Sequence, residues 1–231
     1  MWILPLAAAV VASLFAAMLL RRASDRRRPY RILWGIAMIM YAVASASVAL
    51  GAANGWGRGT FFVYWAVGAV LNVPFLAAGE IVLLLRRSVV LALILLVLLG
   101  VSIATIAIVA QASVDPHALE RDLPSGKLVF GPESAAFGLP QLISIPSYLL
   151  LVIGALWSAW SIRGGPGLRD RFVGTLLIVL GATVTAVAGS AFAAEGNLPA
   201  FSVALLAGIT VMFWGFLRAS RTPVPPPPSR G

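Results

Sequence analysis

Cysteine is absent from the 231-residue chain, and charged residues make up only 11% of it. The lack of cysteine excludes disulfides, thiolate chemistry and iron–sulfur ligation. A soluble chain carries about 25% charged residues, so the polar residues here are too few to cover a water-exposed surface. With one histidine and eight acidic residues, little material for catalysis remains. We expect no catalytic residues and no cofactor.

Lysine and histidine each occur once, as Lys127 and His117. Lys127 lies outside every apolar run, which excludes the retinal Schiff base that the rhodopsins form on a lysine of a spanning helix. His117 stands near Asp115, Glu120 and Asp122, but their spacing matches no standard metal site. A solvated polar loop is the preferred interpretation, and no metal is predicted. Phosphate-binding glycine loops, zinc-protease helices and nucleophile elbows are also missing.

Hydrophobic residues make up 60% of the chain, and they occur in runs of roughly 20, the length of a membrane-spanning helix. Lipid cannot satisfy an unpaired backbone N–H or C=O group, so each run must be helical. The sequence therefore predicts an all-α membrane protein, a seven-helix bundle in a lipid bilayer. The predicted spans are residues 2–20, 30–51, 61–85, 89–112, 137–162, 172–194 and 199–217.

Basic residues alternate between the two sides of these spans. One side has fourteen arginines: Arg21, Arg22, Arg26, Arg27, Arg28, Arg31, Arg86, Arg87, Arg163, Arg169, Arg171, Arg218, Arg221 and Arg230. The other side has only Arg58, Arg121 and Lys127. Because positively charged loops stay in the cytoplasm, we expect the N-terminus outside and the C-terminus in the cytoplasm. The net charge of +9 is thus a mark of topology, and no nucleic-acid partner is expected.

The predicted transmembrane domain covers residues 1–218, and two segments outside its spans are polar or proline-rich. Residues 113–136 form a long outer loop with four of the eight acidic residues. Residues 219–231 form a Pro-rich cytoplasmic tail, expected to be extended or disordered. Docking of this tail into an aromatic groove of a partner is the alternative.

Polar residues and prolines interrupt two of the spans. The third contains Asn72, Pro74 and Glu80, and the fifth contains Gln141 and Ser144 close to Pro140 and Pro146. Broken, polar-lined helices can form a transporter site, so these residues are the candidate intramembrane site. Ordinary proline kinking is the simpler interpretation.

Glu80 is the only ionisable residue well inside a predicted span. An unpaired carboxylate at this depth costs a few kcal/mol. A structural ion pair with an arginine such as Arg87, seven residues later, is the preferred interpretation because shallow charges reach the interface. A functional proton or cation site is the alternative.

Small residues line one face of the sixth span. Gly181, Thr185 and Gly189 recur every four residues, a spacing that lets helix backbones approach closely in lipid. This face should pack against another helix of the same chain, and a homodimer seam is the alternative.

Two short segments resemble known families. The run from Gly68 to Glu80, with Tyr64 and Trp65 before it, is similar to uncharacterised multi-pass membrane proteins of GC-rich bacteria, which implies a bacterial cell membrane and no assigned activity. Pro140-Gln141 resembles the dipeptide of the PQ-loop transporters. That resemblance implies a repeat of spans one to three in spans five to seven, with span four as connector.

The leading functional hypothesis is a non-enzymatic protein that senses or moves a small molecule or ion, or supports a membrane complex. A PQ-loop-like transporter of small solutes and an intramembrane enzyme are the alternatives. A hydrated cavity lined by Asn72, Glu80, Gln141 and Ser144 would favour transport or sensing, and a filled bundle would favour a scaffold.

Overall fold

The computed structural model describes residues 2–24, 28–85, 87–162 and 168–220. Over these ranges every regular element is a helix, and seven helices are long and apolar enough to cross a membrane. The prediction of an all-α fold with seven helices long enough to span a membrane is confirmed for the described residues. The Pro-rich tail beyond Ser220 lies outside the described residues.

The seven helices start and end close to the predicted spans. They are α1 (Ile3–Ser24); α2 (Pro29–Asn54); a third made of α3 (Arg58–Val63), η1 (Tyr64–Leu71) and α4 (Asn72–Leu85); α5 (Ser88–Gln111); a fifth made of α7 (Ala135–Leu139), η3 (Pro140–Ser144) and α8 (Ile145–Ile162); a sixth made of α9 (Arg169–Thr183), η4 (Val184–Ala188) and α10 (Gly189–Glu195); and α11 (Leu198–Ala219). The stretches η1, η3 and η4 are π-helical, and such turns are frequent at functional sites.

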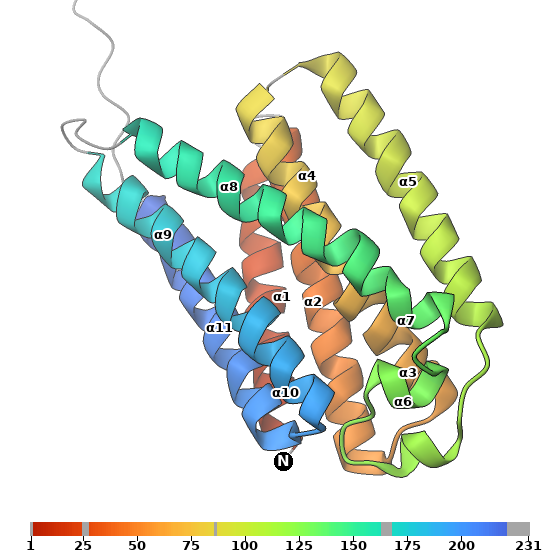
Figure 1. The fold of residues 1–231 in the computed structure, drawn as a ribbon. Helices are drawn as coiled ribbons and strands as arrows, with labels where there is room; N and C mark the ends of the chain where they lie inside the picture. Colours follow the sequence, from red (N-terminus) through yellow and green to blue (C-terminus); the bar gives the residue numbers. More distant parts are fainter. Residues whose placement is uncertain (1, 25–27, 86, 163–167, 221–231) are drawn as a thin grey trace, which may run out of the picture.

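Six of the seven helices form a closed ring, which we call the six-helix ring. Around it α1 packs against α2, α2 against α4, α4 against α8, α8 against α9, α9 against α11, and α11 against α1. The remaining helix, α5, lies outside the ring and contacts η1, α4 and α7 (Figure 1). Only 11% of its central residues are buried, so most of its leucine and valine side chains face outward, as lipid-facing residues do.

The two ends of the ring differ in chemistry. At one end, the arginine-rich end, lie Arg21, Arg22, Arg28, Arg31, Arg87, Arg169, Arg171 and Arg218. The opposite end is covered by the long loop between α5 and α7. It contains the 3-10 helix η2 (His117–Glu120) and the short helix α6 (Gly126–Phe130), and it buries Leu123, Val129 and Phe130 in the hydrophobic core.

Close backbone packing joins α9 to α11. A Cβ atom at Gly181 would lie 2.5 Å from the carbonyl oxygen of Gly208, and one at Gly174 would lie 2.6 Å from that of Gly215. The two pairs are seven residues apart on both helices, the spacing of a left-handed crossing. Only glycine at these positions lets the two backbones come this close.

Only part of the small-residue face predicted on the sixth span packs closely against another helix. Gly181 and Thr185 do face α11 of the same chain, where both crowd Gly208. Gly189 is buried, but a Cβ atom there would be 3.8 Å from its nearest neighbour, in Phe201. That is ordinary van der Waals contact, so Gly189 is not a close-packing position. The sequence could have shown the heptad spacing of Gly208 and Gly215 instead.

Candidate functional site

A small cavity lies inside the six-helix ring, in the half nearer the arginine-rich end. Its volume is about 80 Å³, room for about two or three waters at some 30 Å³ each. All six ring helices line it and α5 does not. The lining residues are Phe15, Leu19, Trp34, Met38, Leu76, Glu80, Leu83, Leu151, Ala155, Ser158, Thr175, Ile178, Val179, Ala182, Met212 and Phe216.

Glu80 is the only ionisable residue among those lining residues. Its side chain comes from α4 and is 4% exposed, and its Oε1 atom has no hydrogen-bond partner in the described part of the chain. None of the arginines that the structure describes forms an ion pair with it. The structural pair expected with Arg87 is therefore not formed.

A glycine on the facing helix makes room for this carboxyl group. A Cβ atom at Gly154 of α8 would lie 2.9 Å from Cγ of Glu80. Small residues recur around it on the same face of α8, with Ala155 and Ala159 almost fully buried. This signal, a cluster of small residues at helical spacing, is present in the sequence, whereas the prediction placed the polar residues of the candidate site in the proline-rich half of the same span.

The rest of the cavity wall offers few polar atoms. Ser158 and Thr175 contribute hydroxyl groups, and the Thr175 hydroxyl donates to the carbonyl of Arg171 at 2.9 Å. The indole N–H of Trp34 donates to the carbonyl of Leu76 at 3.1 Å. The carboxyl group of Glu80 thus stands in a mainly hydrocarbon environment.

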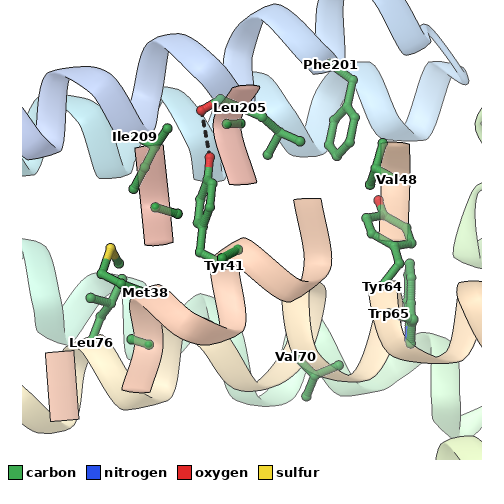
Figure 2. Packing of buried hydrophobic residues seen from close by; sticks show 14 of the residues in the cluster. Met38, Tyr41, Val48, Tyr64, Trp65, Val70, Leu76, Phe201, Leu205 and Ile209 are labelled. Carbon is green, nitrogen blue, oxygen red and sulfur yellow. Dashed lines mark hydrogen bonds between the residues drawn. The ribbon is translucent and has the colours of Figure 1, made fainter. Parts of the chain in front are cut away.

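Hydrogen bonds between helices lie one turn beyond the cavity, toward the loop-covered end. The hydroxyl of Tyr41 on α2 donates to the carbonyl of Leu205 on α11 at 2.7 Å (Figure 2), and it lies 3.4 Å from Oγ1 of Thr185. Tyr148 on α8 donates to Thr183 on α9 at 2.8 Å. The bonds of Tyr41 connect α2 to helices that are not its neighbours in the ring, and the bond of Tyr148 connects two neighbouring helices.

Aromatic side chains fill the ring beyond this layer. Phe61 lies at their centre and is 1% exposed, and ring contacts connect Trp56, Phe61, Tyr64, Trp65, Phe130 and Phe201. Figure 2 shows Tyr64, Trp65 and Phe201 among the packed residues. The cavity is thus separated from the loop-covered end by a thick aromatic layer.

The prolines of the third and fifth helices are matched by reciprocal hydrogen bonds. Pro74 has no N–H to offer the carbonyl four residues earlier, at Val70. The hydroxyl of Ser144 lies 3.0 Å from that oxygen and 2.8 Å from the carbonyl oxygen of Ala69, and it can donate to either. Pro140 likewise leaves the carbonyl of Ala136 without its helical donor, and the indole N–H of Trp65 donates to it at 2.9 Å. Each helix therefore supplies the donor that a proline of the other removes.

The predicted intramembrane residues are not brought together in one site. Asn72 donates to the carbonyl of Ala37 on α2 at 2.6 Å, and Ser144 and Pro74 belong to the bonds just described. Gln141 is exposed. With its amide nitrogen turned toward the carbonyls of Phe137 and Gly138, it donates to these groups of its own helix. Of the five, only Glu80 lines the cavity.

A second hollow, of about 460 Å³, lies on the loop-covered end. Trp56 and Leu119 line it together with the charged residues Glu120, Arg121 and Asp122, which are exposed. His117 lies nearby, and its Nδ1 is 3.5 Å from Oε1 of Glu120 at the surface. This groove is open at the surface and its charged residues are exposed, so their charges need no ligand to compensate them.

Comparison with protein-family models, with curated proteins and with solved structures gave no match to this chain. The resemblance to multi-pass proteins of GC-rich bacteria therefore stays a prediction, and the function must be argued from the cavity itself.

Proposed function

We propose that the protein is a multi-pass protein of the bacterial cell membrane, with the arginine-rich end in the cytoplasm, that moves a small cation through the cavity at Glu80. The observation that carries this proposal is a buried carboxyl group that forms no ion pair with any residue that the structure describes, in a cavity framed by six helices. Ionisable residues inside membrane spans are costly and mark ion pathways and proton relays.

A purely structural role for Glu80 does not account for its unpaired carboxyl group as well as a cation site does. A structural carboxylate at this depth requires a cation or a set of donors, and Oε1 of Glu80 has neither among the described residues. Asp170 shows what a structural pair looks like in this protein, with Oδ1 3.0 Å from Nε of Arg218. Both partners of that pair are partly exposed, and they lie at the helix ends.

The size of the cavity limits its occupant. About 80 Å³ holds an ion with a water or two, and it is far smaller than the roughly 300–1,000 Å³ of sites for larger organic ligands. A cation also compensates the charge of Glu80. A sugar or an amino acid would need a much wider bundle.

The order of helices around the ring favours a second candidate, a small-solute transporter with a repeat of three helices. The first three helices and the last three follow each other around the ring in the same sense, and α5 stands outside as a connector would. Transporters are often built from such repeats. Gln141, however, is exposed and does not line the cavity, so the PQ-loop-like dipeptide does not contribute to a site here.

An intramembrane enzyme is the least supported of the three hypotheses. General acid–base or nucleophilic chemistry needs a second group beside the carboxyl. The lining residues that the structure describes contain no histidine and no second carboxylate.

Cation flux tests the proposal. The purified protein is reconstituted into liposomes, a membrane potential is imposed, and uptake of protons, Na⁺ and K⁺ is followed with separate fluorescent indicators. We expect the wild type to move one of these ions and Glu80→Gln to fall to the level of protein-free liposomes.

The matched control is Asp170→Asn, which removes a carboxylate at the same end but outside the cavity, and it should retain the flux. Absence of flux in the wild type for all three ions, or equal flux in Glu80→Gln, would refute the proposal.

A further inference from the structure

We infer that the cation bound at Glu80 is a proton, held covalently on the carboxyl group, and not a metal ion. This inference rests on the proposed function and names the ion that the site takes. In chemical terms, hydronium in the water of the cavity gives its proton to a carboxylate oxygen of Glu80, an O–H bond forms, and water remains. The reverse step returns the proton to water.

The first argument is the number of oxygen ligands. Metal cations need an oxygen shell, with six to eight ligands for Ca²⁺ and six in near-octahedral geometry for Mg²⁺, and K⁺ filters replace the hydration shell with rings of carbonyls. The side chains lining this cavity offer one carboxyl group and the hydroxyls of Ser158 and Thr175. The remaining space, about 80 Å³ in all, holds too few waters to complete such a shell.

The second argument is the polarity of the wall. Thirteen of the sixteen lining residues, all except Glu80, Ser158 and Thr175, have hydrocarbon, aromatic or thioether side chains. An unpaired ionised carboxylate in such surroundings costs several kcal/mol, and a neutral carboxyl group costs far less. A proton removes the charge completely, whereas a poorly coordinated metal ion would add a second desolvated charge.

The third argument concerns the arginines between the cavity and the water at the arginine-rich end. On α1, Arg22 places its guanidinium 5.5 Å from the ring centre of Phe216, a residue of the cavity wall. On α2, the side chain of Arg31 donates to the carbonyl of Arg22 at 2.9 Å and to the hydroxyl of Tyr30 at 3.3 Å. Positive charges fixed at this place oppose a resident metal cation, whereas a proton bound to Glu80 leaves a neutral carboxyl group that they do not repel.

The other elements around Glu80 add charge only at their ends. Arg28, at the N-cap of α2, is hydrogen-bonded to Tyr30. Arg21 lies at the end of α1, and Arg87 lies at the start of α5. Arg169 and Arg171 lie in the first turn of α9. Arg218 of α11 pairs with Asp170, and the described part of α8 carries no ionisable side chain besides Tyr148. Glu80 can therefore change charge without breaking an ion pair in the described structure.

Infrared difference spectroscopy of the full chain in lipid tests the inference directly. The difference between the spectra at low and high pH should contain the C=O stretching band of a protonated carboxylic acid in a dry environment, because this band is present at low pH and disappears as the pH rises. Glu80→Gln should lose the band, and Asp170→Asn should keep it. Addition of Na⁺, K⁺ or Ca²⁺ at fixed pH should leave it unchanged.

A second variant keeps the test valid if Glu80→Gln does not fold. Gly154→Ala keeps the carboxyl group but adds a Cβ atom 2.9 Å from Cγ of Glu80, so the band should shift in frequency and in its pH midpoint. A band that Na⁺ or K⁺ displaces, a carboxylate that stays ionised at every pH at which the protein is folded, or a band that Gly154→Ala leaves unchanged would overturn the inference.

The two proposals fail in different ways. If Glu80→Gln abolishes Na⁺ or K⁺ flux and metal ions displace the band, cation movement stands and the proton is the wrong ion. If the band titrates as expected but no ion crosses the membrane, Glu80 binds a proton and the proposed transport is wrong.

Discussion

Replacing Gly208 by alanine should destabilise the protein far more than replacing Gly189 by alanine, although both glycines lie where the sixth and seventh helices pack together. At Gly208 a Cβ atom would lie 2.8 Å from the carbonyl oxygen of Gly181 and would collide with Oγ1 of Thr185. Backbone oxygen cannot rotate away as a side chain can, so α9 and α11 must separate. At Gly189 the same atom would be 3.8 Å from Phe201.

The magnitude follows from two opposing effects. Alanine is better than glycine in a helix by about 0.5–1 kcal/mol, and this gain applies at both positions. Overpacking typically costs about 1–3 kcal/mol, and it applies only at Gly208. We expect Gly189→Ala to be neutral or slightly stabilising, and Gly208→Ala to be less stable than it by about 2 kcal/mol, or about 30-fold in the unfolding equilibrium.

Reversible unfolding in mixed micelles, with increasing SDS and detection by circular dichroism, measures both variants on one scale. Gly181→Ala provides a second test, because its Cβ atom would lie 2.5 Å from the carbonyl oxygen of Gly208. If Gly208→Ala and Gly189→Ala had equal midpoints, the close approach of α9 and α11 would not exist, and this part of the reasoning would be refuted.

Three other predictions follow from the contacts between helices and from the charge asymmetry. Trp65→Phe and Ser144→Ala should each lower the free energy of unfolding by about 1 kcal/mol, because each variant leaves without a donor a carbonyl group that a proline four residues later cannot bond. Unchanged midpoints in the same SDS titration would contradict this role. Tyr41→Phe should cost a similar amount and, because Tyr41 lies one turn beyond the cavity, should leave the carboxylic-acid band of the cavity in place, whereas loss of the band would show that the hydroxyl belongs to the site. The chain has no cysteine, so single cysteines at Asp122 and Ser220 report topology: an impermeant thiol reagent should label the first in intact cells and spare the second, and the opposite pattern would reverse the orientation.

The helices were predictable because the membrane environment makes them a local property of the sequence. A segment that cannot hydrogen-bond to its surroundings must satisfy its own backbone, so composition and length are sufficient to locate α2 or α5. Glu80 was predictable for a related reason, since it is the only acidic or basic residue deep inside an apolar run.

The partners of each helix were not predictable in the same way. In lipid the outward face of a helix is as apolar as the buried face, so the sequence pattern says little about how α4 or α8 is rotated. The bond from Ser144 to the carbonyl of Val70 and the bond from Asn72 to that of Ala37 depend on that rotation and on the order of helices around the ring. The polar residues of the third and fifth spans therefore looked like one site, whereas most of them hold helices together.

The position of α5 has a consequence for how such a chain can be inserted and how it can have arisen. A unit with an odd number of spans ends on the side opposite to its start, so a second three-helix unit joined directly to the first would be inserted upside down. One extra crossing corrects this parity. With α5 present, α1 and the fifth helix run in the same direction, and the arginine-rich ends of both halves face one side. Without α5, the arginines that follow α8 and begin α9 would have to cross to the opposite side, against the charge bias that orients the first half. The helix α5 contributes no side chain to the cavity, yet it is the helix that allows both halves to line the cavity in the same orientation.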